Sequence, residues 1–97
     1  MRLFPAGQLP GELPGEELIR AGLDDLQRGD VTVAALLVSV GAPRLRLLGL
    51  EIPQTLEAPE DTLFALLERD DPVGAHSRYN ALIRRLVSFE NAAECLV

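Results

Sequence analysis

The run of residues 31–40 restricts the fold more than any other part of the sequence, because these ten residues include no charged side chain. A segment so apolar has to be buried on most of its sides, and it is about half as long as a helix that crosses a bilayer. Its centre, two alanines followed by two leucines, favours a helix, capped by Asp30 or Thr32 and ended by Gly41. Its four valines leave a buried strand as the alternative, since periodicity alone cannot assign a short apolar run.

Residues 15–28 form a clear amphipathic pattern. Leucine, isoleucine and glycine recur at helical spacing on one face, while acidic and basic residues occupy mainly the other. Glu16 and Glu17 in the first turn and Arg28 in the last turn complement the helix dipole, and Gly29 provides a stop. We therefore predict a helix over residues 15–28.

A proline in the first turn marks the start of three further predicted helices. The first of them is short and ends at Gly49, and the last is long and is capped by Asp71. Apolar residues in the long helix follow the i, i+3, i+4 spacing of a buried helical face. These three helices are predicted over residues 43–48, 59–69 and 72–96.

The predicted fold is all-α, a compact bundle of four to five helices in a single domain over residues 1–97. A chain of 97 residues can bury one core, and 19 leucines against four aromatic residues favour interdigitated helices over a β-sandwich. Residues 1–14 are rich in proline and glycine, including the doublet LPGE, so we expect an irregular, extended N-terminal arm. The helices are predicted over residues 15–28, 31–40, 43–48, 59–69 and 72–96.

The charge balance and the cysteine content restrict partners and compartment. The net charge of −6 opposes binding to nucleic acid, which depends on lysine and arginine neutralising phosphates. A single cysteine, Cys95, cannot form an intramolecular disulfide, and no leader pattern is visible. We therefore expect a cytoplasmic protein with no membrane-spanning helix and no nucleic-acid partner.

His76 is the best candidate for acid–base chemistry, since it is the only histidine and histidine titrates near neutrality. On a helix, Asn80 shares its face at i, i+4, and Tyr79 lies close enough to orient a substrate. A histidine with polar neighbours at a helix start is more often a solvated or hydrogen-bonded side chain. His76, Tyr79 and Asn80 are therefore weak catalytic candidates, and a non-enzymatic role is favoured.

Two pairs of arginines form small basic spots in an acidic chain. Arg44 and Arg46 lie in the predicted short helix, and Arg84 and Arg85 are adjacent in the last helix. Either pair is a candidate site for an anion or for a protein partner. A structural role is favoured over a ligand site, since the arginines of the last helix can form surface ion pairs with the acidic residues of the helices before it.

No pattern for a metal or a cofactor is present, so we expect neither. One histidine, one cysteine and no regularly spaced carboxylates leave no zinc, iron or calcium motif, and no glycine-rich phosphate loop occurs. Three functions remain open. A protein-interaction or homo-oligomeric assembly module is favoured, with a symmetric homodimer as the working hypothesis. The alternatives are a small hydrolase or nuclease-like enzyme using His76, and a regulatory domain that binds an anion.

Overall fold

Helix α2 (Val33–Leu47) is the element around which the chain is organised in the computed structural model, which describes residues 13–95. Four consecutive α2 residues, 35–38, have no exposed surface. The prediction of a central buried helix in this segment is therefore confirmed over the strand alternative. The side chain of Thr32, one of the two proposed caps, accepts a hydrogen bond from the backbone N–H of Ala35 at 3.0 Å, which satisfies a donor of the first turn.

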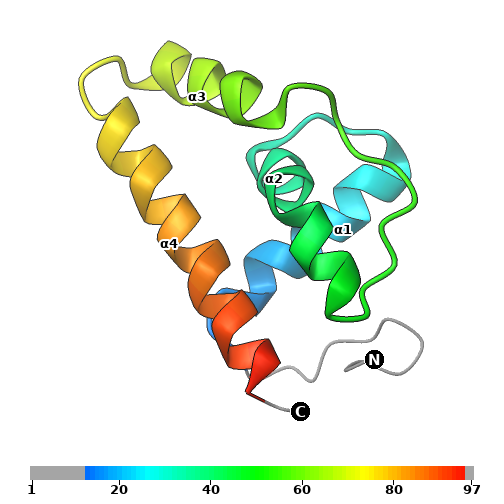
Figure 1. Cartoon of the computed structure of the whole chain (residues 1–97). Helices are drawn as coiled ribbons and strands as arrows, with labels where there is room; N and C mark the ends of the chain where they lie inside the picture. The colour runs from blue at the N-terminus through cyan, green and yellow to red at the C-terminus, as the bar shows by residue number, and fades with distance from the viewer. Residues whose placement is uncertain (1–12, 96–97) are drawn as a thin grey trace.

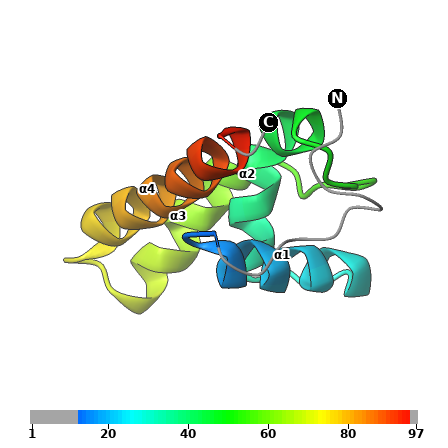
Figure 2. The same ribbon diagram turned by 90° about the horizontal axis from the view of Figure 1, so that it is seen from below.

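The other three helices of the described residues pack around α2. Helix α1 (Glu16–Arg28) crosses it, while α3 (Pro59–Asp70) and α4 (Ala75–Glu94) contact both α2 and each other (Figure 1). Seen from below, α1 runs along one side of α2, and its beginning approaches α4 (Figure 2). One buried cluster contains residues of all four helices. The predicted all-α bundle is thus confirmed; of the predicted N-terminal arm, residues 1–12 lie outside the described part of the chain.

The prediction of two separate helices over residues 31–40 and 43–48 is wrong, because α2 continues through Gly41 and Pro43. Gly41 does not end the helix. A Cβ atom at this position would lie 2.8 Å from a methyl group of Leu86, so the glycine allows α4 to pack closely on α2. Burial of Leu45 on the same helix stabilises the turn that contains the proline. The helix ends where predicted, beside Gly49, which has a φ of 107°.

The last helix also begins later than predicted, at Ala75 instead of residue 72. Asp71 caps the intervening turn, and not the helix, since its carboxylate accepts the backbone N–H of Gly74 at 3.0 Å. The helix ends at Glu94, two residues before the predicted end. Helices α1 and α3 agree with their predicted ranges to within one residue. Within the described residues, no helix is long and apolar enough to cross a membrane.

The connector between α2 and α3 is held to the core along its length. Leu50 and Ile52 are buried, and the backbone N–H of Leu56 donates to the hydroxyl of Ser39 on α2 at 3.1 Å. The same hydroxyl donates to the carbonyl of Ala35 at 2.9 Å. This buried serine therefore joins the connector to the central helix, which fixes where α3 begins.

Candidate functional site

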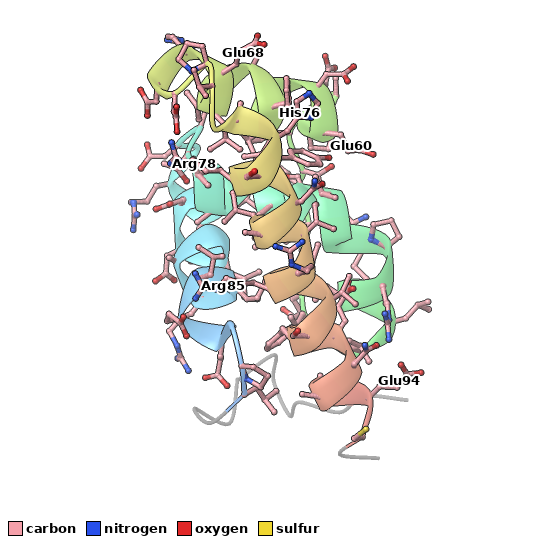
Figure 3. All side chains as sticks on the ribbon, turned by 90° about the vertical axis from the view of Figure 1, so that its left-hand side faces the viewer. Glu60, Glu68, His76, Arg78, Arg85 and Glu94 are labelled. Carbon is pink, nitrogen blue, oxygen red and sulfur yellow. The ribbon has the colours of Figure 1, made fainter. Side chains whose placement is uncertain are left out.

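His76 and Tyr79, two of the predicted catalytic candidates, lie in the first turns of α4 against the ring of Phe64 on α3. The ring centroids of His76 and Phe64 are 4.8 Å apart, and those of Tyr79 and Phe64 are 5.9 Å apart in an edge arrangement. Such geometry is typical of aromatic side chains packed together. Figure 3 looks onto this corner of the molecule, with His76 and Glu60 labelled.

The chemistry of this corner does not favour proton transfer. Burial raises the pKa of the Tyr79 phenol, and the carboxylates of Glu60 and Asp61 raise it further, so the hydroxyl stays protonated near neutral pH. Among the described residues, His76 and Asn80 take part in no hydrogen bond or ion pair. The three candidates therefore lie near one another but form no hydrogen-bonded relay within this part of the chain.

Arg44 joins α2 to the end of α4. Its guanidinium lies 3.0 Å from the amide oxygen of Asn91 and 3.5 Å from a carboxylate oxygen of Glu90, and it also pairs with Glu94. Two of these three partners lie one helical turn apart, at Glu90 and Glu94, so a single arginine reaches both. The guanidinium of this predicted anion-binding residue is thus engaged by the carboxylates of its own chain.

Glu90 is the most unusual of these partners because it is only 5% exposed. Burial raises the pKa of its carboxyl group, while the positive charge of Arg44 acts in the opposite direction. Its place beside Gly41 explains how the carboxylate fits at the contact between α2 and α4, since a Cβ atom there would lie 3.2 Å from a Glu90 oxygen.

Arg46, the second predicted residue of this pair, holds the connector. Its guanidinium donates twice to the carbonyl oxygen of Ile52, from Nε at 2.8 Å and from Nη2 at 2.6 Å. This contact joins the last turn of α2 to the connector that follows Gly49. The structure therefore does not bring Arg44 and Arg46 together on one ligand, since one faces α4 and the other faces the connector.

The second arginine pair lies where the beginning of α1 approaches α4. Arg85 forms an ion pair with Glu17 in the first turn of α1. Gly15 precedes that turn with a φ of 74°, and a Cβ atom on it would lie 3.0 Å from the Arg85 carbonyl oxygen. A glycine is thus favoured here both by its backbone angle and by the close approach of the two segments.

A surface hollow of about 500 Å³ opens beside this contact. Among the described residues, Arg84 has no hydrogen bond or ion pair, so its guanidinium is free at the wall of the hollow. Figure 3 shows Arg78 and Arg85 on the side of α4 that faces α1. The residues that line the hollow are Pro14, Gly15, Ala81, Arg84, Arg85 and Ser88.

Sequence reasoning found the arginines of this site but missed its other wall. The LPGE segment signalled a turn, and the structure places the Pro14–Gly15 part of that turn against α4. The position of Ser88 and Ala81 follows from helical spacing with Arg84. What the sequence lacked was the crossing that brings the first turn of α1 beside the middle of α4.

Within residues 13–95, no group of three or more histidine, cysteine or acidic side chains is arranged to hold a metal ion. Comparison of the chain with protein-family models, curated proteins and solved structures found no significant match. The function is therefore inferred from the surfaces of the molecule itself.

Proposed function

We propose that this protein is a self-associating helical module that forms a homodimer through the outer face of α4. The observation that carries the proposal is a mismatch of charge within one chain. Arg84 on α4 has no partner among the described residues, and the exposed acidic residues Glu68 and Asp70 at the end of α3 have none either. A second copy provides the complementary charge for both groups.

The segment that contains these acids is strongly negative. Residues 59–71 include five acidic residues and one arginine, a net charge of −4. The chain as a whole is also acidic, at −6, so a contact between two copies is favoured where an arginine of one meets acids of the other. The outer face of α4 is suited to this role because it presents basic side chains and no acidic residue between Ala75 and Phe89.

The outer face of α4 also allows another helix to approach closely. Side chains on the inner face pack on α2 and α3, whereas the opposite face presents the small residues Ser77, Ala81 and Ser88, four and seven residues apart. Small side chains at such spacing allow two helices to pack at short distance. Val87, at 40% exposure, adds an apolar side chain beside this face.

The two alternative functions have less support. A hydrolase using His76 needs a group that orients or exchanges a proton with the imidazole, and the aromatic packing on Phe64 provides none. A regulatory anion site at Arg44 and Arg46 would have to displace the internal contacts to Glu94 and Ile52. The first function lacks a partner for the imidazole among the described residues, and the second would break contacts that join α2 to α4 and to the connector.

The experiment that tests the proposal is the solution mass, measured by light scattering on a size-exclusion column over a wide range of protein concentration. The chain has a mass of 10.5 kDa, so the proposed dimer has twice that mass, about 21 kDa. A mass that rises from the monomer to the dimer value with concentration supports the proposal. A mass of 10.5 kDa at every concentration, including the millimolar range, would overturn it.

A further inference from the structure

We infer that the hollow beside Arg84 receives the corner between α3 and α4, residues 70–74, of a second copy of the chain. This inference rests on the proposed self-association and adds its register and its contacting residues. Two properties of the corner fit the hollow. Its carboxylate, Asp70, has no ion pair among the described residues, and its Val73 is 97% exposed.

The register follows from the pattern of α4. Small residues at Ser77 and Ala81 allow closest approach if the two helices run antiparallel about a two-fold axis that passes between these positions. Each Ser77 then packs on Ala81 of the second copy. The same symmetry places Ala75, the first residue of α4, opposite Ile83 of the other chain. The corner of residues 70–74, which comes just before Ala75, then lies beside Arg84 and the hollow of the other chain.

The chemistry of the hollow matches that corner. The free guanidinium of Arg84 presents a fork of donors that suits a carboxylate such as Asp70. The wall formed by Pro14, Gly15 and Ala81 is apolar, so it suits the valine at position 73. Val73 is otherwise difficult to explain, since it is more exposed than any other large hydrophobic residue described.

The existing pair of Glu17 and Arg85 supports a carboxylate as the occupant. Glu17 already binds the neighbouring guanidinium at the edge of the hollow, which demonstrates the geometry available to a carboxylate there. The negative charge of Glu17 offsets the positive charge of Arg85, which leaves the charge of Arg84 at the wall of the hollow. One carboxylate of a second copy matches that single charge.

The symmetry of the dimer doubles each contact. Because a two-fold interface is isologous, both hollows are filled when one is, and both Arg84 side chains are paired. The contact extends beyond the two α4 helices to the beginning of α1 and the end of α3. Such an extension is needed for a stable interface, which normally buries more than about 1,000 Å² in total.

A charge exchange between positions 70 and 84 tests the inference. The variants are Asp70→Arg and Arg84→Glu, and each one alone places like charges at both symmetric contacts. We expect each purified variant to have a dimer dissociation constant at least about tenfold above the wild-type value. An equimolar mixture is expected to form a heterodimer of near wild-type stability. In that heterodimer the introduced arginine of one chain meets the introduced glutamate of the other, and the native Asp70 and Arg84 meet at the second contact.

Matched controls make the same changes of charge elsewhere. Glu57→Arg lies on the connector, and Arg28→Glu lies at the far end of α1; both are expected to leave the dissociation constant within about twofold of wild type. Circular dichroism of each variant, with the thermal transition, verifies that the helices are intact. Light scattering and sedimentation then report the association of folded protein only.

The outcomes separate the inference from the proposed function. If the wild type is a dimer and both charge variants dimerise as strongly as the control variants, the inference is wrong and self-association still stands. Variants that dissociate alone and also remain monomeric when mixed would overturn the pairing of positions 70 and 84. A wild-type protein that stays monomeric would overturn the proposed function itself. If each variant dissociates on its own and the equimolar mixture restores the dimer, both the inference and the proposed function are supported.

Discussion

Gly22 of α1 lies directly against the backbone of Ala34 on α2, so that a Cβ atom added to the glycine would be 2.3 Å from the alanine carbonyl oxygen. The same atom would lie 2.4 Å from a methyl group of Val38. Contact at this distance with a backbone atom cannot be relieved by a change of rotamer. The crossing of α1 over the central helix therefore depends on the absence of a side chain at position 22.

Gly22→Ala is expected to destabilise the fold by about 2 kcal/mol or more, because the methyl group forces α1 away from α2. This result is opposite to the gain that alanine normally gives in a helix. The free energy of unfolding in urea measures it. The matched control is Ala21→Ser on the exposed side of the same turn, which should change stability by less than about 0.5 kcal/mol. Equal stabilities of the two variants would contradict the close crossing.

Arg46→Ala is expected to lower the free energy of unfolding by about 1–3 kcal/mol, since the carbonyl of Ile52 loses both of its charged donors. The exposed Arg69 forms no hydrogen bond or ion pair with another described residue, so Arg69→Ala provides the control and should have an effect below about 0.5 kcal/mol. Denaturant unfolding compares the two. If Arg46→Ala and Arg69→Ala change the free energy of unfolding by the same amount, Arg46 does not hold the connector.

The buried carboxyl group of Glu90 makes the free energy of unfolding depend on pH. Its folded-state pKa is raised, chiefly by burial, so the folded chain binds a proton more tightly than the unfolded chain does. The contribution of Glu90 to stability is therefore fully present below the unfolded pKa of about 4.3 and is lost as the pH rises through the folded value. Stability measured from about pH 4 to about pH 8 should show this loss in the wild type and not in Glu90→Gln.

A substitution of the neighbouring arginine extends this test. Arg44 lowers the pKa of Glu90, so Arg44→Met should enlarge the loss of stability over the same pH range. A wild-type profile parallel to that of Glu90→Gln would mean that the carboxylate is solvated and not buried. Each variant is compared with itself at low and at high pH. A loss of stability that is the same at every pH, caused by the missing ion pairs, therefore does not affect the result.

Val73→Ser is expected to weaken the dimer and leave the monomer unchanged. The side chain is 97% exposed in the monomer, so folding stability should change by less than about 0.5 kcal/mol. Burial of two valines per dimer contributes about 1–3 kcal/mol in total, so the dissociation constant should rise about fivefold or more. Val31→Ser, at a residue that is 61% exposed beside α2, is the control. An equal effect of both variants would argue against the corner as a contact.

The helices and the hydrophobic core were largely predictable from the sequence, since they follow from local periodicity and end signals. The apolar run of residues 31–40 is buried as its composition required, and Thr32 and Gly49 act at the ends where they were expected. The predicted break at Gly41 failed for a physical reason. A glycine is a stop signal in isolation, but here the close packing of Leu86 explains its presence inside a helix.

The candidate site was less predictable because it depends on contacts between distant segments. The adjacency of Arg84 and Arg85 is visible in the sequence, but the Pro14–Gly15 wall opposite them is set by how α1 crosses the bundle. The role of Arg44 also depends on a crossing, since its partners lie 46 to 50 residues away. Periodicity identifies which face of a helix is buried, and it does not identify the helix on the other side.

The central claim, that two copies associate through the outer face of α4, is tested most directly by a disulfide across the proposed two-fold axis. Ser77→Cys and Ala81→Cys proteins, each also carrying Cys95→Ser, are mixed under mild oxidation and compared with a control carrying Glu57→Cys and Cys95→Ser. We expect rapid cross-linking between positions 77 and 81, at a rate independent of dilution while the dimer persists, and little at position 57. Cross-linking at position 57 as fast as that between positions 77 and 81 would contradict the claim.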